Sequence, residues 1–335
     1  MTMPEMSVII PAEHRGKFLA KAIESAICMT SPAGGFEIIV GLLRGDTDAR
    51  RTAEEVMGRA GVQVHLVEAG GRSHASILNA ACRLARGRVL VFADDDCVFS
   101  PDWLVVLDEV WKTHPGAVMV GGSDRLPPGS SPFALALDVV LNSWVGSGMA
   151  RRGEGWRAGT YYPKLWGMAI LREKAMELAR PSDNGPRVFD EDLEVMEAAD
   201  LGSRCRSAGY QILYCKDWVI GHHRHTNWKL FALRCWQMAV AAKRLGTHGF
   251  AHGLLAIWNV GMLLAVFAAV LVGGFRPVVL SAFGLYAAIL LTMGLVGAVK
   301  TGRASVAWRV PLLLMVVHFA RGWGYLLGSR NGSGV

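Results

Sequence analysis

The chain has 335 residues, of which 52% are hydrophobic and 19% are charged, and its formal net charge is +7 at pH 7. This composition is too apolar for an ordinary water-soluble domain, and the apolar residues gather after residue 250. The positive charge fits an anionic membrane surface and phosphorylated substrates. Nucleic acid is not an expected partner, because no basic run is interleaved with aromatic residues. The six cysteines lack C-x-x-C spacing, which argues against zinc or redox chemistry.

Strand and helix patterns alternate over the first hundred residues. Four short apolar runs predict buried strands, at 7–11, 36–43, 62–67 and 88–93. Three segments with helical spacing lie between them, at 17–29, 49–60 and 72–86. This alternation predicts an α/β fold with a parallel, doubly wound sheet. No glycine-rich fingerprint follows the first strand, so a nicotinamide or flavin enzyme is not expected.

Three consecutive carboxylates, Asp94, Asp95 and Asp96, follow the fourth predicted strand directly. Because like charges repel and each is costly to desolvate, we expect a cation among them. Mg²⁺ or Mn²⁺ is the natural candidate, since these hard ions take oxygen ligands and bridge phosphate oxygens. Open α/β sheets also bind ligands at the carboxyl ends of their strands. This position favours a metal and diphosphate site over a solvated acidic turn.

Further strands are predicted at 117–121, 165–171 and 211–215, with helices at 173–180 and 228–244. The irregular stretch 142–164 combines arginines with aromatic residues, which suits sugar stacking and phosphate contact but also an ordinary surface loop. An acidic segment, 189–194, precedes a helix that runs through Glu197 and Arg204. The tract 221–225 contains three histidines and Arg224. We favour its imidazoles facing a diphosphate over a zinc site, because no tetrahedral ligand set accompanies it.

Three apolar runs, at about 253–275, 277–299 and 306–328, are each long enough to span a membrane. Arg309, His318 and Arg321 interrupt the third run, which therefore either spans or lies partly in the interface. Basic residues between the second and third runs place the large N-terminal part on the cytoplasmic side. The absence of a signal-peptide pattern before Ser7 agrees. The predicted domains are 1–246 and 247–335.

In their order and spacing, several of these segments resemble family 2 glycosyltransferases. The resemblance covers Ser7 to about Gly246 and rests on these motifs: Ser7-Val8-Ile9-Ile10-Pro11, Phe36-Glu37-Ile38-Ile39-Val40, Asn79-Ala80-Ala81, Ala85-Arg86-Gly87, Phe92-Ala93-Asp94-Asp95-Asp96, Pro101-Asp102-Trp103, Phe189-Asp190-Glu191, and Arg204 with Ala208-Gly209-Tyr210. The tail, with His318-Phe319-Ala320 and Gly322-Trp323-Gly324, is similar to enzymes that extend lipid-linked units of bacterial exopolysaccharides of the succinoglycan type. The family implies a GT-A fold, a Rossmann-like, mostly parallel sheet flanked by helices, here followed by transmembrane helices. It further implies a multi-pass protein of the bacterial inner membrane with a cytoplasmic catalytic domain.

The resemblance also implies a reaction. An inverting transfer would move a sugar from a nucleoside-diphosphate donor, with a UDP-sugar expected, to a polyprenyl-linked or other lipid-linked saccharide in polysaccharide or glycolipid synthesis. A divalent metal would bind the Asp-x-Asp motif, with Asp96 as ligand, Asp94 on the metal or the ribose, and His223 as a further ligand. The implied donor-binding residues are Pro11, Ala12, Glu13, Asp46, Arg72, Asn79, Asp94, Asp95, His223 and Arg224. The implied acceptor residues are Trp166, Arg234, Trp236 and Gln237.

The chain departs from the family pattern at two places. The nucleobase-contacting Asp usual after the second strand is replaced by Gly41-Leu42-Leu43, with Asp46 following later. Counting back from Gly209, Glu197 is the Glu of the family's Glu-Asp pair and Ala198 stands where the catalytic Asp is expected. An alanine side chain cannot remove the proton from the hydroxyl group of the sugar acceptor. General-base catalysis typically raises the reaction rate by about 10²- to 10⁴-fold.

Three explanations of Ala198 remain open. In the first, the catalytic base has moved to an earlier position, Asp192 or Asp190. In the second, a neighbouring carboxylate, Asp200 or Glu197, substitutes for it. In the third, the chain is an inactivated variant. Two other functions also stay open. One is a catalytically silent membrane protein that binds nucleotide sugars. The other is a processive polysaccharide synthase, although three C-terminal helices are few for a secretion channel.

Overall fold

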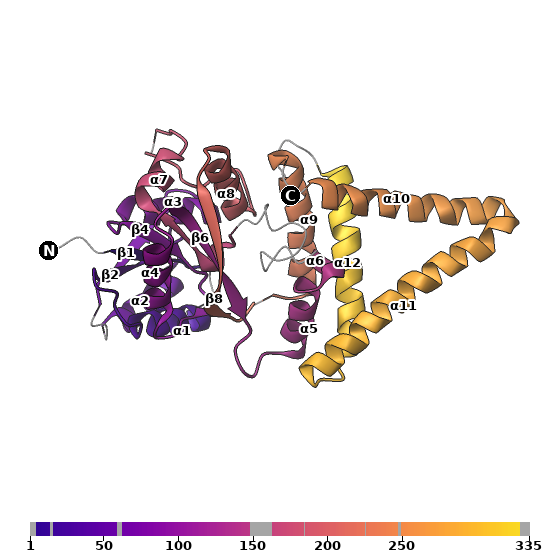
Figure 1. Cartoon of the computed structure of the whole chain (residues 1–335), viewed down its shortest axis with the longest axis horizontal. Helices are drawn as coiled ribbons and strands as arrows, with labels where there is room; N and C mark the ends of the chain where they lie inside the picture. The colour runs from indigo at the N-terminus through magenta and orange to yellow at the C-terminus, as the bar shows by residue number, and fades with distance from the viewer. Residues whose placement is uncertain are drawn as a thin grey trace. The chain divides into compact units, whose positions relative to one another are not determined.

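The computed structural model describes residues 5–13, 16–58, 62–147, 163–183, 185–224, 226–246 and 249–328. The chain forms two compact units (Figure 1). The first unit consists of residues 1–127 and 152–224, and the second unit consists of residues 128–151 and 225–335. This division differs from the predicted boundary after residue 246, because Pro132–Leu141 and Trp228–Leu245 share a buried apolar cluster with Val306–Leu327.

The first unit is built on an eight-stranded sheet with the order β3-β2-β1-β4-β7-β6-β8-β5. Its strands are β1 (Met6–Pro11), β2 (Phe36–Leu42), β3 (Val64–Glu68), β4 (Val89–Phe92), β5 (Cys97–Val98), β6 (Ala117–Arg125), β7 (Met168–Leu171) and β8 (Gln211–His222). β1 to β4 pair in parallel and so do β6 and β8, while β7 and β5 run antiparallel to their neighbours. The predicted mostly parallel α/β sheet is therefore confirmed.

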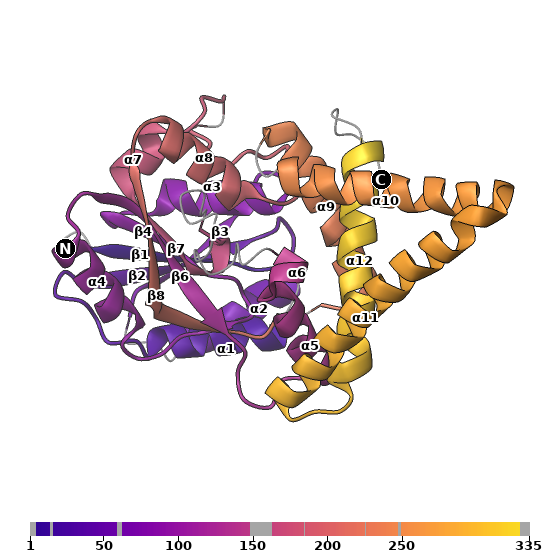
Figure 2. The same ribbon diagram turned by 45° about the vertical axis from the view of Figure 1, so that its right-hand side comes forward.

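Helices cover both faces of this sheet (Figure 2). They are α1 (Gly16–Ile27), α2 (Thr47–Met57), α3 (His74–Leu84), α4 (Trp103–Thr113), η2 (Leu165–Gly167), α7 (Arg172–Glu177) and α8 (Glu197–Ser207). Because strand side chains alternate between faces, Val8 and Ile10 join the apolar cluster with α1, α2 and α4, whereas Ile9 joins the cluster with α3 and α8. Burial on both faces explains why the central strands are continuous apolar runs.

β6 and β8 are both longer than predicted, and the difference shapes the site. Their pairing shifts register between Gly121 and Ser123 and then continues to the strand ends. The extra residues of this bulge, 215–218, lie on β8 and oppose the single residue Gly122 of β6. A Cβ atom on Gly122 would lie 2.4 Å from the carbonyl oxygen of Trp218, so a larger residue would force the strands apart. The continuation carries Asp124 and His222 to the carboxyl ends of β6 and β8.

The second unit is helical. It comprises α5 (Pro132–Leu141), α6 (Trp144–Ser147), α9 (Trp228–Leu245), α10 (Gly249–Leu271), η3 (Gly273–Phe275), α11 (Arg276–Thr301) and α12 (Val306–Leu327). α12 contributes the largest share of the buried apolar cluster that it forms with α5, α9 and α11. Figures 1 and 2 show α10 and α11 meeting at η3 and diverging toward the two ends of α12.

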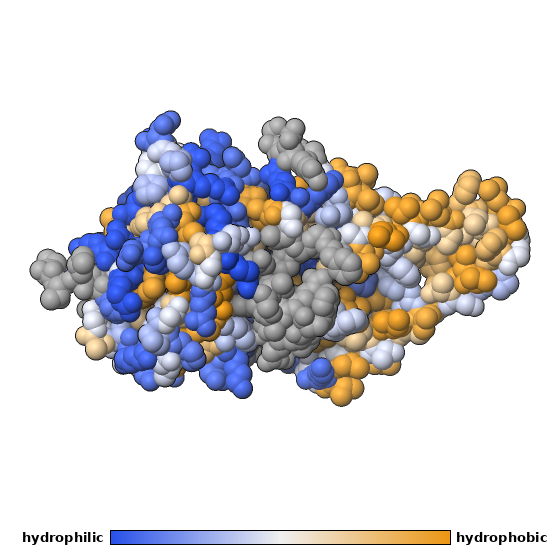
Figure 3. Space-filling view, turned by 45° about the horizontal axis from the view of Figure 1, so that its top comes forward, coloured by the Kyte–Doolittle hydropathy of each residue, from blue (hydrophilic) through white to orange (hydrophobic). Residues whose placement is uncertain are grey.

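Three helices of the second unit are long and apolar enough to cross a membrane: α10, α11 and α12. They match the predicted apolar runs to within a few residues. Only 11% of the most apolar window of α10 and of α11 is buried, compared with 39% for α12. Figure 3 shows hydrophobic side chains over the visible face of the α10–α11 hairpin. Such exposed apolar surface is typical of contact with lipid, and it supports association with a membrane.

Candidate active site

The site lies where β4, β6 and β8, which run in the same direction, reach their carboxyl ends. Asp94, Asp95 and Asp96 follow β4, and the short strand β5 then pairs antiparallel with β8 so that Cys97 lies opposite His222. The backbone N–H of His223 donates to the carbonyl oxygen of Asp96 at 3.0 Å. This register places the side chain of His222 beside the carboxylate of Asp96.

Three carboxylates surround the imidazole of His222. Its Nε2 lies 3.1 Å from Oδ1 of Asp96 and 3.9 Å from Oδ2 of Asp94, and its Nδ1 lies 3.3 Å from Oδ2 of Asp124. Arg224 donates to the same oxygen of Asp124 at 2.8 and 3.0 Å. Burial alone would lower the pKa of His222, but the charge of Asp96 and the hydrogen bond to Asp124 raise it to about 9. At neutral pH this imidazole therefore carries a proton that balances the carboxylates.

The donor atoms at this position fit a divalent cation. Two adjacent ligands of an octahedral ion with bonds of about 2.1 Å lie about 3 Å apart, and Oδ1 of Asp96 and Nε2 of His222 are 3.1 Å apart. A bound cation would replace the imidazole proton. Cys97 also lies within 4.8 Å of both residues. However, burial raises the pKa of its thiol well above the ordinary value, so it stays a neutral, soft group that suits Mg²⁺ or Mn²⁺ poorly.

His222 was not among the residues singled out from the sequence, which favoured His223. Because neighbouring strand residues point to opposite faces, only one of the two can face Asp96. The ring of His223 lies 5.1 Å from that of Phe18, and burial lowers its pKa. The strand predicted from the sequence ended at residue 215, so the choice between the two histidines depends on the pairing of β8 with β5 and β6. His225 and the Arg- and aromatic-rich residues 148–162 of the predicted sugar-binding loop lie outside the described residues.

The predicted donor-binding residues take several positions in the first unit. Pro11 ends β1, and the backbone N–H of Ala12 donates to Gly41 at 2.8 Å. The backbone N–H of Glu13 donates to Oδ2 of Asp95 at 2.8 Å, so this buried carboxylate holds the loop after β1 against the acidic turn. Arg72 is exposed in the turn before α3.

Asp46 and Asn79 make local contacts that shape the backbone. Oδ1 of Asp46 accepts from the backbone N–H of Ala49 at 3.0 Å and caps α2. Asn79 is fully buried, and its amide group makes 2.9 Å hydrogen bonds to both backbone groups of Phe189 and to the Glu191 carboxylate. These bonds hold the loop that leads to α8, which indicates an architectural role.

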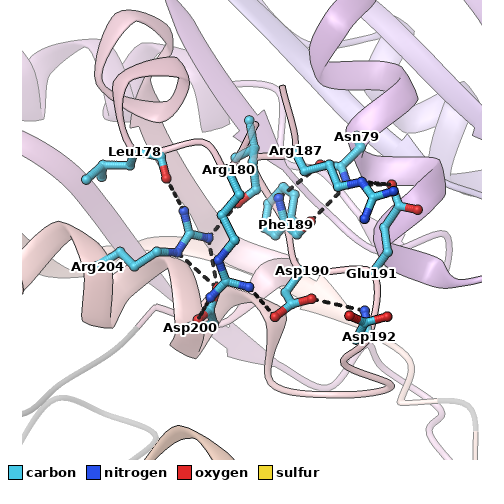
Figure 4. A network of polar contacts seen from close by, with 11 residues as sticks. Asn79, Leu178, Arg180, Arg187, Phe189, Asp190, Glu191, Asp192, Asp200 and Arg204 are labelled. Carbon is cyan, nitrogen blue, oxygen red and sulfur yellow. Dashed lines mark hydrogen bonds and ion pairs between the residues drawn. The ribbon is translucent and has the colours of Figure 1, made fainter. Parts of the chain in front are cut away.

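An ion-pair network links the loop before α8 with the first and last turns of this helix (Figure 4). Asp200 accepts from Arg204 at 2.8 and 3.0 Å and from Arg180 at 3.1 Å. Asp190 pairs with the same Arg180 and also accepts from the backbone N–H of Asp192 at 3.1 Å. Two of the four carboxylates considered as replacement bases, Asp190 and Asp200, are therefore engaged with guanidinium groups.

The start of α8 carries the position of the expected base. Met196, immediately before it, has a φ of 71°, a left-handed conformation that costs about 1 to 3 kcal/mol and is frequent at functional sites. Oε1 of Glu197 lies 3.2 Å from Nδ1 of His74, at the start of α3. Burial alone would lower the pKa of His74, but the hydrogen bond and charge of Glu197 raise it to about 9. Ala198 is buried at the beginning of the apolar stripe that Leu201 continues.

The predicted acceptor residues are divided between the two units. Trp166 lies in η2 of the first unit, and its ring is 5.7 Å from that of His222. Arg234, Trp236 and Gln237 lie on α9 of the second unit and are partly buried. Sequence reasoning missed His74, Asp124 and His222, all of which the fold brings to the carboxylate-rich end of the first unit.

Comparisons with known proteins agree with this architecture. The model of a family described as "Glycosyltransferase like family 2" matches residues 4–244. The mannosyltransferase PcManGT from Pyrobaculum calidifontis, solved with GDP-Man and Mn²⁺, is 16% identical with a TM-score of 0.56, and the match covers 96% of this chain and 88% of that one. This likeness shows a common fold. TarS from S. aureus matches with 14% identity and a TM-score of 0.45, covering 72% of this chain and 69% of that one. Glucosyl-3-phosphoglycerate synthase from M. tuberculosis matches with 17% identity and a TM-score of 0.44, covering 73% and 81%.

Proposed function

The chain belongs to the family 2 glycosyltransferases, and from this premise we propose that it transfers a sugar from a nucleoside-diphosphate donor to a lipid-linked acceptor. The observation that carries the proposal is the 3.1 Å approach of Asp96 and His222 at the carboxyl ends of the strands. The apolar helices α10 to α12 support an acceptor held in a membrane. We expect a UDP-sugar donor and the bacterial inner membrane, with the first unit in the cytoplasm.

Asp96 and His222 would hold the divalent cation, with Asp94 beside them. Such an ion neutralises the diphosphate that leaves as the glycosidic bond breaks. Asp124 accepts from both Arg224 and the imidazole of His222, and so fixes the orientation of this ring. Asp95 positions the loop after β1 through the backbone of Glu13.

Proton removal from the acceptor is the step for which this chain is poorly equipped. Ala198 supplies no base, and Asp190 and Asp200 are bound by arginines. Glu197 is buried and lies 3.2 Å from the imidazole of His74 rather than against a guanidinium group among the described residues. We therefore propose Glu197 as the base for slow transfer, with the exposed Asp192 as the second candidate. An Asp at position 198 would restore the family's base and would be stabilised by the N-terminus of α8.

The test compares the full-length wild type with the A198D and A198N variants, purified in detergent. Donor hydrolysis and transfer are measured with UDP-, GDP- and TDP-sugars and Mn²⁺. We expect A198D to raise turnover by about 100-fold or more, the usual contribution of a general base. A198N introduces a side chain of the same size without a base and should leave turnover unchanged.

Equal turnover of the wild type and A198D would show that the base lies elsewhere, and E197Q compared with D192N then identifies it. A catalytically silent nucleotide-sugar-binding protein is the second candidate function, favoured by Ala198 itself. Mn²⁺-dependent donor binding by the wild type, with no turnover of A198D on any donor or acceptor, would support that function and contradict sugar transfer.

A further inference from the structure

The second unit has an excess of cations that its own carboxylates cannot balance. It contains eleven of the 35 Lys and Arg residues but only one of the 28 Asp and Glu residues, Asp138. Asp138 accepts from its helix neighbour Asn142 at 2.7 Å. A single carboxylate cannot neutralise eleven cations, so their counter-charges must come from outside this unit.

One of these cations lies within the apolar helix α12. Arg321 is one turn after His318, so both side chains share a face of the helix. Nη1 of Arg321 donates to the carbonyl oxygen of Gly146 at 3.3 Å, and Nε2 of His318 lies 3.1 Å from that of Val145. Nδ1 of His318 lies 2.8 Å from the hydroxyl of Tyr286 on α11. Helices α6, α11 and α12 thus form one polar cluster, which Asn259 of α10 joins by donating to the carbonyl oxygen of His318.

Two buried atoms of this cluster have no hydrogen-bond partner within the described part of the chain: Nε of Arg321 and Oδ1 of Asn259. Asn259, on α10, is only 1% exposed, and its amide nitrogen donates to the carbonyl oxygens of His318 and Phe319. It packs so closely that a Cβ on Gly322 would lie 2.2 Å from this nitrogen. An unmet buried polar group costs about 1 to 3 kcal/mol, and more when it is charged.

We propose that this cluster binds the phosphate of a membrane lipid, with Arg321 as the charged ligand. A phosphate supplies the negative charge that the second unit lacks, and its oxygens accept from a guanidinium in charge-assisted hydrogen bonds. Arg321 is only partly buried, so a head group can reach it, and the surrounding helices present apolar surface to the lipid chain. The phosphate comes either from a phospholipid or from the lipid-linked acceptor, and only the second source rests on the proposed function.

The test measures binding of farnesyl phosphate to the full-length chain in phosphatidylcholine nanodiscs by calorimetry. Farnesol and inorganic phosphate serve as probes that lack the charge or the lipid. The variant is R321Q, and the matched control is R303Q, because Arg303 is exposed in the turn between α11 and α12. R321K retains the charge, and a thermal melt confirms that each variant is folded.

We expect farnesyl phosphate to bind wild type and R303Q at least about tenfold more tightly than farnesol does, a difference of about 1.4 kcal/mol. R321Q should lose this difference, and R321K should keep most of it. Equal binding of farnesol and farnesyl phosphate, an unchanged difference in R321Q, or displacement by equimolar inorganic phosphate would each overturn the proposal.

Competition identifies the source of the phosphate. Displacement of farnesyl phosphate by equimolar phosphatidylglycerol supports a phospholipid site, whereas retention in its excess supports an acceptor site. The assay contains no nucleotide sugar, no metal and no turnover. Its failure therefore leaves the proposed sugar transfer standing, and a failure of transfer leaves this site standing.

Discussion

The two units treat their charged side chains differently. The first unit has a net charge of −3 and pairs its buried charges internally, as Asp200 does with Arg180 and Arg204. The second unit has a net charge of +10, and its described arginines Arg309 and Arg321 donate to backbone carbonyls. The first unit therefore balances nearly all of its charges with its own side chains and its ligands, whereas the second unit needs anions from its surroundings.

The largest effect on stability is expected at Asp200, in the ion-pair network of the first unit. D200N would remove the carboxylate, whose side chain is only 5% exposed, from Arg204 and would leave Arg180 with Asp190 alone. We expect a loss of about 3 to 5 kcal/mol in the free energy of unfolding, measured by denaturant titration in detergent. E173Q is the control, since Glu173 is 88% exposed, and a D200N variant as stable as this control would contradict the comparison.

The next largest effect concerns the metal site. D96N should weaken Mn²⁺-dependent donor binding by more than about 100-fold, because loss of a direct ligand exceeds the 10- to 100-fold cost of losing a neighbouring contact. Binding is measured by titration calorimetry with and without Mn²⁺. D102N is the control, because Asp102 is exposed and its side chain makes no capping hydrogen bond. Unchanged affinity of D96N would show that the site is misassigned.

A smaller effect should follow pH through His74. Because Glu197 raises the pKa of His74 from 6.5 to about 9, the pair stabilises the fold fully below about pH 6.5 and loses this contribution as pH rises through 9. The maximum contribution is about 3 kcal/mol at 1.36 kcal/mol per pKa unit. The difference in unfolding free energy between wild type and E197Q should therefore be largest at pH 6 and small at pH 10. A pH-independent difference would argue against the ion pair.

The smallest effect is expected in the second unit. Arg309 donates to Ser305 in its own helix and lies 4.2 Å from the ring centre of Trp308. R309Q removes a cation–π contact worth about 0.5 to 1 kcal/mol at a partly exposed site, so the melting temperature in detergent should fall by only a few degrees. A loss of stability as large as that expected for D200N would show that Arg309 has a buried counter-charge. It would then contradict the proposed difference between the two units.

Local patterns were sufficient for much of the architecture. The apolar runs before Pro11 and Asp94 became β1 and β4, and the three C-terminal runs became α10 to α12, because periodicity and length are properties of contiguous residues. The loss of a carboxylate at Ala198 was also visible locally, since spacing along one helix locates the position. The family followed from the order of these motifs and is confirmed.

The amino-acid sequence by itself determined the mostly parallel sheet, the acidic end of β4 and the membrane-compatible helices. Tertiary structure alone decided which histidine faces Asp96, because that depends on the pairing of β8 with β5 and on the bulge of β8 opposite Gly122. It likewise decided that Asp200 pairs with Arg180 from before the loop and that α5 packs with α12. The physical reason is common to all three, since each depends on contacts between segments far apart in sequence, which no local pattern encodes.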